Sequence, residues 1–308
     1  MKALAWGRVL RLSLAPSALA DVAAGALIGG RGEFPPLREL WPLLVASACV
    51  YHGGMALNDW SDREHDGRTR PERPIPSREL SAPLVVACGA FLLASGVACA
   101  ALVSFDAALW FLGIAALVLA YDLGPRGAWS GPLLLGACRA ANLGAGLLFA
   151  SRFSADASAT PLPALAAPAL LYGAYVMCAS RVARMEDAAH GSNGAPGARA
   201  AAAAVCALLI ATAFVDARSP KALGFDLLAL AVAVGGAWGL ARTVWSVRVW
   251  DAAQCGRFTG MALRRLLMFT AACVLAHRGA LIDGVLVAAV ILAGFPLATA
   301  LRRVFPPT

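Results

Sequence analysis

The chain has 308 residues, of which 60% are hydrophobic and 14% charged, with a net charge of +8. Its mean hydropathy is +0.70. Soluble domains carry about 25% charged residues, so the composition excludes an ordinary soluble globular protein. It also argues against a nucleic-acid partner, because no basic patch interleaved with aromatic residues stands outside the apolar stretches.

The apolar residues form long blocks, and no charged residue occurs in 40–58, 80–105 or 157–180. Runs of about twenty apolar residues match the thickness of a bilayer. Such segments must be helical, because lipid offers the backbone no hydrogen bonds. In chain order the candidate helices are 11–30, 40–58, 81–103, 106–121, 132–151, 162–181, 199–216, 222–243, 261–277 and 281–301. The sequence thus predicts an all-α integral membrane protein, a bundle of nine to ten transmembrane helices.

Two of these helices need comment. The first is not a cleavable signal peptide, because Asp21 interrupts it and further apolar helices follow. The ninth is short for a span, because Arg264 and Arg265 lie within its first turns. Counting ten helices puts Arg302 and Arg303 on the same side as the N-terminus, as the distribution of basic residues favours.

Basic residues orient the bundle, since cytoplasmic segments carry an excess of lysine and arginine. With a cytoplasmic N-terminus, 19 of the 26 basic residues fall inside. We therefore expect an inner-membrane protein with a cytoplasmic N-terminus, adapted to an anionic leaflet. Nothing indicates a second domain. Residues 1–308 are expected to form one transmembrane domain, with cytoplasmic cap loops near 59–80, 182–198 and 244–260.

The most informative segment follows the second helix and reads Asn58-Asp-Trp-Ser-Asp-Arg-Glu-His-Asp66. If the helix continues, Asp59, Asp62 and Asp66 lie at i, i+3 and i+7 and share one face. Three clustered carboxylates repel one another unless a cation lies among them. Mg²⁺ prefers one or two protein carboxylates together with waters and phosphates, so the spacing suits a magnesium-bridged diphosphate.

The next residues supply arginines in a proline-rich loop. Arg68, Arg70 and Arg73 alternate with Pro71, Pro74 and Pro76 within 68–77. Guanidinium groups bind phosphate oxygens in a bidentate manner, and proline limits the freedom of the loop. An ordinary charged loop that obeys the positive-inside rule explains the arginines equally well. It does not explain the carboxylates.

Arg139 and Asn142 lie three residues apart within a predicted membrane helix and so share one face. A charged residue in a span usually faces the interior of the bundle or a cavity. The two side chains would contact a diphosphate or the polar group of an acceptor. The alternative is a polar clamp between helices, from Arg139 to Asp106 or Asp122. Asp21 would pair with an arginine.

The segment 58–77 resembles the UbiA superfamily of intramembrane prenyltransferases. Its pattern Asn-Asp-x-x-Asp-x-x-x-Asp is complete at 58–66, and an Arg-Pro-x-Pro-Ser run follows at 73–77. Arg11-Leu-Ser-Leu with Pro16 and Gly25, and Tyr121-Asp122, are similar to other parts of that superfamily. The resemblance implies a central cavity open to lipid, with a prenyl diphosphate held through Mg²⁺ and its prenyl group passed to an acceptor. By motif match, the residues implied to bind Mg²⁺ are Asn58, Asp62 and Asp66, with Asp59 beside them as a further catalytic residue. The residues implied to hold diphosphate oxygens are Arg68, Arg70 and Arg73.

The superfamily's second acidic motif is degraded here. Its place is taken by 180–190, where Glu186 and Asp187 are adjacent and point about 100° apart on a helix. Arg181 and Arg184 would replace a second cation, or the stretch is an ordinary loop. An intact first motif with a degraded second one is similar to the UbiA-like EboC subgroup of bacterial proteins. Gly131-Pro132 and Cys138-Arg139-x-x-Asn142-Leu143 resemble that subgroup as well.

Three functions remain open at this stage. The leading hypothesis is an Mg²⁺-dependent prenyltransferase that moves a prenyl group from a prenyl diphosphate to a lipophilic acceptor, aromatic or other. The second is a non-catalytic UbiA-like membrane protein that binds or transports an isoprenoid or an aromatic metabolite. The third, a sugar-phosphate or lipid-phosphate transferase, is opposed by the Asn-Asp spacing and the Arg-Pro-x-Pro run.

Overall fold

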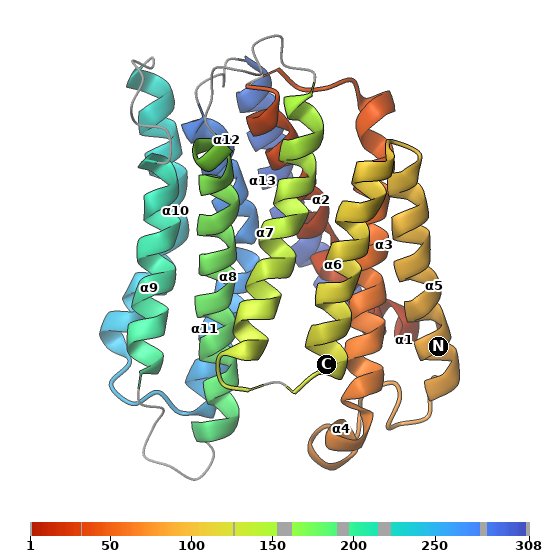
Figure 1. Cartoon of the computed structure of the whole chain (residues 1–308). Coiled ribbons are helices and arrows are strands. Elements are labelled where there is room, and N and C mark those ends of the chain that lie inside the picture. Colours follow the sequence, from red (N-terminus) through yellow and green to blue (C-terminus); the bar gives the residue numbers. More distant parts are fainter. Residues whose placement is uncertain are drawn as a thin grey trace.

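The computed structural model describes residues 2–31, 33–125, 127–152, 162–189, 197–214, 223–277 and 282–305. All regular secondary structure in these ranges is helical (Figure 1). The helices in chain order are α1 Lys2–Val9, η1 Leu12–Leu14, α2 Ala15–Gly29, α3 Leu37–Ser61, α4 Arg63–Thr69, α5 Ala82–Ala101, α6 Phe105–Leu123, α7 Ser130–Ser151, α8 Leu162–Ala189, α9 Ala198–Ala211, η2 Thr212–Phe214, α10 Leu223–Ser246, α11 Ala252–Arg264, α12 Leu266–Ala276 and α13 Ile282–Val304.

Within the described residues, eight helical segments are long and apolar enough to cross a membrane. They comprise η1 with α2, then α3, α5, α6, α7, α10 from Asp226, α11 with α12, and α13. Large apolar side chains point away from the bundle, among them Phe91, 70% exposed, and Val290, 73% exposed. The prediction of an all-α integral membrane protein is confirmed. The 28-residue α8 and the shorter α9 are not among the eight segments, so a total of nine to ten spans stays a prediction.

The first and ninth predicted helices differ from expectation. The first begins one residue later than predicted, at Leu12, because Arg11 has a φ of 50°, the left-handed conformation that non-glycine residues seldom adopt. The ninth begins earlier than predicted, because α11 and α12 meet at Arg265 and form one segment, Ala252–Ala276. The arginines do not shorten this span, since Arg265 donates hydrogen bonds to the backbone oxygens of Gly236 and Met261.

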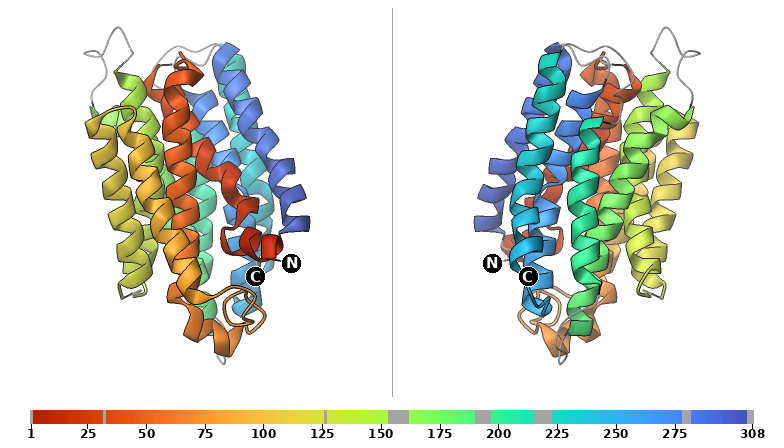
Figure 2. Two further views of the ribbon diagram at one scale, coloured as in Figure 1. Left: turned by 90° about the vertical axis from the view of Figure 1, so that its right-hand side faces the viewer. Right: turned by 90° about the vertical axis from the view of Figure 1, so that its left-hand side faces the viewer.

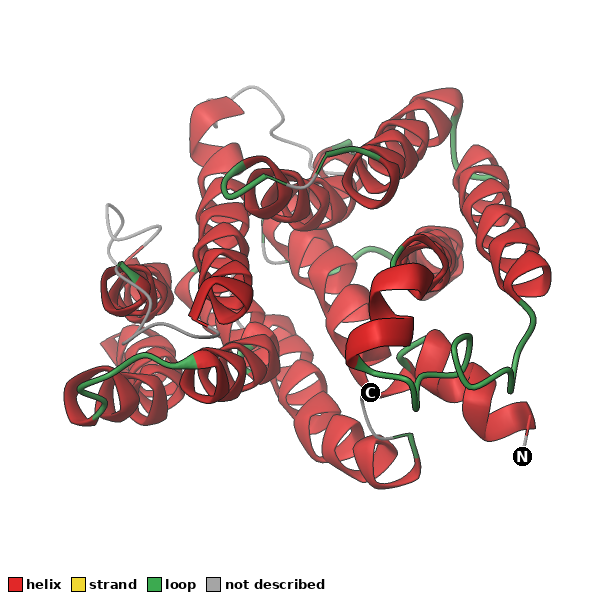
Figure 3. Ribbon diagram, turned by 90° about the horizontal axis from the view of Figure 1, so that it is seen from below, coloured by secondary structure: helices red, strands yellow, loops and turns green. Residues whose placement is uncertain are grey.

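Small residues allow the helices to approach closely, as is usual in lipid. α2 and α7 cross where a Cβ on Gly25 would lie 2.0 Å from the Leu143 carbonyl oxygen. A Cβ on Gly146 would lie 2.0 Å from the Val22 carbonyl oxygen at the same crossing. The cavity residues of α7 are therefore held at a fixed position against those of α2. Seen from below, the helices enclose the central region (Figure 3).

The polar segments gather at one end of the bundle. α4 and the turn after it lie below the membrane helices in Figures 1 and 2. The end of α8 and the start of α11 lie at the same end, because the Glu186 carboxylate approaches Arg70 and would meet a Cβ on Gly256 at 3.2 Å. The segments expected as cap loops are thus partly helical, in α4, the end of α8 and the start of α11.

Candidate active site

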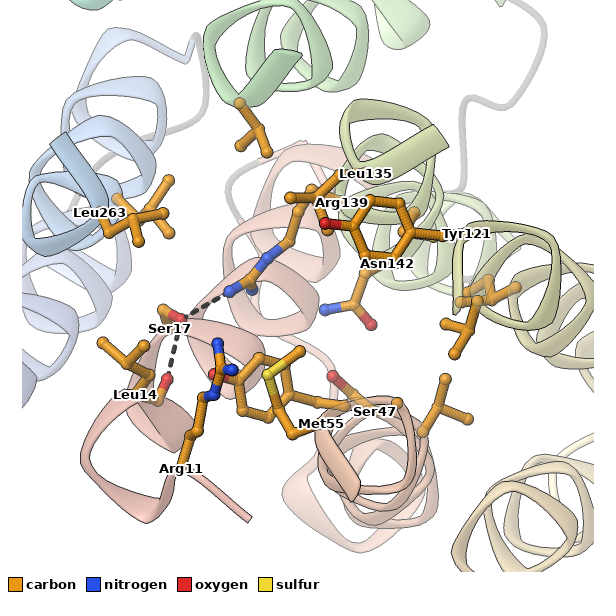
Figure 4. A pocket seen from close by; sticks show the side chains of 18 of the residues that line it. Arg11, Leu14, Ser17, Ser47, Met55, Tyr121, Leu135, Arg139, Asn142 and Leu263 are labelled. Atoms are coloured by element: carbon orange, nitrogen blue, oxygen red, sulfur yellow. Dashed lines mark hydrogen bonds between the residues drawn. The ribbon is translucent and has the colours of Figure 1, made fainter. Parts of the chain in front are cut away.

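A cavity of about 150 Å³ lies within the bundle, among η1, α2, α3, α6, α7, α8, α11 and α12. Its walls are mainly apolar, including Val50, Ile114 and Val118. Its polar lining consists of Arg11, Ser17, Ser47, Tyr51, Tyr121, Asp122, Arg139 and Asn142. Arg11, from the turn before η1, and Arg139, from α7, reach toward each other, with Ser17 beside them (Figure 4).

The aspartate motif is connected to this cavity through two of its lining residues. The Asn58 side-chain amide donates to Asp122 Oδ1 at 3.2 Å, and the Ser61 hydroxyl donates to the Asp122 backbone oxygen at 2.6 Å. Arg11 donates to Asp59 Oδ1 at 3.2 Å. The end of α3 is thereby tied to α6 and to the break before η1, and the motif lies against the polar end of the cavity.

Arg73 brings two motif carboxylates together. Its Nη1 lies 2.6 Å from Asp66 Oδ2 and 3.9 Å from Asp59 Oδ1. The helix does not continue as expected, because α3 ends at Ser61 and α4 begins at Arg63. Asp62 between them keeps near-helical dihedral angles, so Asp59 and Asp66 still face the same arginine. The side chains of Asp59, Asp66 and Arg73 are all buried.

The remaining motif residues are more exposed. Asp62 is half-buried at the junction of α3 and α4, and Arg68 and Arg70 lie at the surface. Arg70 is 4.0 Å from Glu186 Oε1. Of the three arginines proposed to hold a diphosphate, the structure directs Arg73 inward to the carboxylates and leaves the other two outside.

The side chains of the aspartate motif fit Mg²⁺ that is shared with a phosphate ligand. In the described part of the chain, no group of three or more Asp, Glu, His or Cys side chains is arranged to hold a metal ion by itself. Mg²⁺ does not need such a cage, since it keeps waters and takes one or two carboxylates with substrate phosphates. The chemistry of Asn58, Asp62 and Asp66, beside a cavity, fits that use. Asp66 would exchange its ion pair with Arg73 for the metal.

A buried polar cluster surrounds Asp21 on α2. Its carboxylate accepts hydrogen bonds from Arg139 at 2.8 Å, Asn142 at 3.0 Å and the Tyr172 hydroxyl at 2.6 Å. Arg139 also donates to Ser17 and lies over the Tyr51 ring, 5.2 Å from its centroid. Arg139 and Asn142 therefore line the cavity and clamp two helices at once.

The partners named for the alternative clamp of Arg139 are wrong, although Arg139 does line the cavity. Asp106 accepts from Arg152 instead, at 2.7 Å, and Asp122 accepts from Asn58. The pairing follows from the close crossing of α2 and α7, which places Asp21 opposite Arg139. The expectation that Asp21 pairs with an arginine is confirmed by its ion pair with Arg139.

The second acidic segment lies at the end of α8. Glu186 is half-buried between Arg70 and Gly256. Arg184 is half-buried as well. The side chain of Asp187 lies outside the described residues.

Sequence reasoning gave no site role to Arg11, Asp122 or Tyr51. Asp122 was visible as the second residue of the Tyr121-Asp122 pair at the end of a helix. Arg11 was visible as a basic residue at the start of the first span. No local pattern marked Tyr51, which lines the cavity and has Arg139 packed over its ring.

Together, the helical bundle and its cavity define an integral membrane protein with an internal cavity that has apolar walls and polar side chains at one end. The family model of the UbiA prenyltransferase family matches residues 18–269. The chain belongs to this family.

Known relatives agree with that assignment. Digeranylgeranylglyceryl phosphate synthase of Methanopyrus kandleri is 32% identical over 109 residues, which are 33% of this chain and 39% of that protein. A UbiA homologue from Archaeoglobus fulgidus bound to DMAPP and Mg²⁺ superposes with a TM-score of 0.62 and 19% identity, covering 95% of this chain and 99% of the other. The apo UbiA homologue from Aeropyrum pernix K1 gives 0.60 and 20%, covering 94% and 98%. These structures show a shared fold.

Proposed function

We propose that the chain is an Mg²⁺-dependent intramembrane prenyltransferase, which moves the prenyl group of a prenyl diphosphate to a lipophilic acceptor. One observation carries the proposal: Arg11 and Asp122 both line the cavity and both bond to the motif, through Asp59 and Asn58. A diphosphate at the motif would then have its prenyl chain in the apolar cavity. The Archaeoglobus relative binds DMAPP with Mg²⁺, which supports the same donor class here.

The proposed chemistry follows from the residues around the cavity. Bound Mg²⁺, with Asn58, Asp62 and Asp66 as ligands and Asp59 beside them, would neutralise charge on the leaving diphosphate. Arg73, with Arg68 and Arg70 from the outer loop, would add guanidinium donors for its oxygens. The apolar walls at Val50, Ile114 and Val118 exclude water from the allylic carbon. Arg139 and Asn142 would fix the polar end of the acceptor.

A direct assay tests this proposal. Purified protein in nanodiscs is incubated with Mg²⁺, geranylgeranyl or farnesyl diphosphate and a panel of lipophilic acceptors. We expect diphosphate release together with a prenylated product, identified by mass spectrometry. Asp62→Asn, which removes one charge from a half-buried carboxylate, should abolish both signals. Tight binding of intact prenyl diphosphate with no product from any acceptor would reject the transferase.

One observation favours a second candidate, a non-catalytic protein that binds or transports an isoprenoid or aromatic metabolite. The second acidic motif is degraded, and the Glu186 carboxylate that remains there faces Arg70 and Gly256. Such a protein would retain the prenyl diphosphate or the metabolite unchanged. The same assay separates the two functions, because only a transferase releases diphosphate.

We further propose that α4 and the loop to residue 80 face the cytoplasm of a bacterial inner membrane, with residues 1–308 acting as one domain. The basic residues concentrated at this end support that orientation. A cysteine introduced at Ser77, in a background without native cysteines, should resist an impermeant thiol reagent in intact cells. Rapid labelling would reverse the topology.

A further inference from the structure

A second pocket lies beside the central cavity, between η1 and α2, α11 and α12, and the last helix α13. Its volume is about 20 Å³, so it admits a group of about the size of one water molecule. Leu14, Ser17 and Leu263 line both this pocket and the central cavity. α13 lies beyond residues 18–269, which the family model matches.

Two arginines stand at this pocket. Arg264 ends α11, and Arg302 lies in the last turn of α13. Both are half-buried, and their positive charges repel each other. In the part of the chain that the structure describes, neither forms an ion pair or a hydrogen bond. Arg265 behaves differently, because it turns to α10 and donates to the Gly236 carbonyl oxygen.

Two like charges held half-buried side by side are unfavourable, and an anion between them relieves the repulsion. Phosphate oxygens are good partners, because a guanidinium group donates two parallel hydrogen bonds to them. One such oxygen would fit the small pocket, and the rest of the phosphate would lie outside against the guanidinium groups. The structure therefore favours a phosphate group over a larger buried ligand.

The surroundings favour a lipid over a free phosphate ion. Leu267, Phe295 and Ala298 form the apolar part of the pocket. Leu297, the neighbour of Ala298 on α13, is 53% exposed. A ligand with a phosphate and acyl chains matches both parts, and arginines near a membrane surface are attracted to anionic lipids.

We propose that Arg264 and Arg302 form a binding site for the phosphate of an anionic phospholipid, whose chains lie on α13. The lipid would seal the seam between α2 and α13 beside the central cavity. The site is independent of prenyl transfer, so it stands or falls separately from the proposed function.

Native mass spectrometry of protein released from nanodiscs tests this site. The nanodiscs contain equal amounts of phosphatidylglycerol and phosphatidylcholine. We expect wild-type protein to retain phosphatidylglycerol preferentially. Removal of each arginine should lower that retention about fivefold, so Arg302→Gln should lose about fivefold and Arg264→Gln/Arg302→Gln about 25-fold. Arg303→Gln, at an exposed neighbour on the same helix, is the matched control and should change little.

Three outcomes would overturn the proposal. The first is equal retention by wild type and by Arg302→Gln, a variant at a helix end that should fold even if the double variant does not. The second is displacement of the lipid by millimolar inorganic phosphate, which would indicate a simple anion site. The third is a wild-type dimer that the substitutions dissociate without change in bound lipid, which would make this face an interface between two copies.

Discussion

Arg73 and Asp66 form a buried ion pair, with 2.6 Å between Nη1 and Oδ2, and the same nitrogen approaches Asp59. Arg73 therefore already neutralises part of the negative charge of the motif carboxylates Asp59, Asp62 and Asp66. A cation that binds to these carboxylates must compete with Arg73 or displace the Arg73 side chain toward a diphosphate. In either case Arg73 and Mg²⁺ act on the same negative charge.

Arg73→Gln should lower stability, because Asp59 and Asp66 remain buried with less compensating charge. Loss of one partner of a buried pair costs roughly 3–5 kcal/mol. Mg²⁺ should raise the melting temperature of this variant more than that of wild type, as measured by thermal melting in detergent. Arg70→Gln is the matched control, since Arg70 is largely exposed and 4.0 Å from Glu186. An equal response of both variants to Mg²⁺ would contradict the shared site.

Arg139→Ala should lower the stability of the folded protein more than it weakens the binding of any ligand. In the described part of the chain, it leaves the fully buried Asp21 with Asn142 and Tyr172 as its remaining side-chain donors. The expected loss is again roughly 3–5 kcal/mol. The double variant Asp21→Asn/Arg139→Gln should recover much of it, because no buried charge remains. A melting temperature for the double variant at or below that of Arg139→Ala would argue against this pair.

Gly25→Ala should disrupt the crossing of α2 and α7, because the new Cβ would lie 2.0 Å from the Leu143 carbonyl oxygen. Backbone must move to accommodate it, which typically costs about 1–3 kcal/mol. Gly113→Ala on α6 is the matched control, since a Cβ there has no neighbour within 4 Å. Thermal melting and size-exclusion chromatography would compare them. Equal melting temperatures would mean that the crossing is looser than the structure has it.

The sequence was sufficient where the signal was local. Long uncharged blocks predicted the helices, and the spacing of Asp59, Asp62 and Asp66 predicted three carboxylates on one face, of which Asp59 and Asp66 face Arg73. The side chains that complete the site could not be found this way. Arg11 reaches Asp59 across 48 residues, and Arg139 reaches Asp21 across 118. Those contacts depend on the left-handed break at Arg11 and on the close crossing of α2 and α7, which no local pattern reveals.

The two acidic segments should contribute unequally to prenyl diphosphate binding. Asp62→Ala removes a proposed Mg²⁺ ligand at the junction of α3 and α4, so binding should be abolished without loss of the folded bundle. Asp66→Ala should have the same effect on binding, but it also leaves Arg73 without its 2.6 Å partner. Asp62→Ala is therefore the cleaner variant. Isothermal titration with geranylgeranyl diphosphate would measure the affinity, with Mg²⁺ and with EDTA.

Glu186→Gln is the comparison for the second segment, because it removes one charge while preserving the shape that packs over Gly256. Glu186→Gln and, as a separate variant, Asp187→Ala should each retain far more binding than Asp62→Ala. Adjacent carboxylates diverge on a helix and do not share a cation. EDTA should abolish binding by wild type and by both second-segment variants, because the diphosphate and the first-motif carboxylates then repel. If Glu186→Gln or Asp187→Ala loses as much affinity as Asp62→Ala, the second segment is itself a metal site. In that case two cations, one at each segment, would hold the diphosphate.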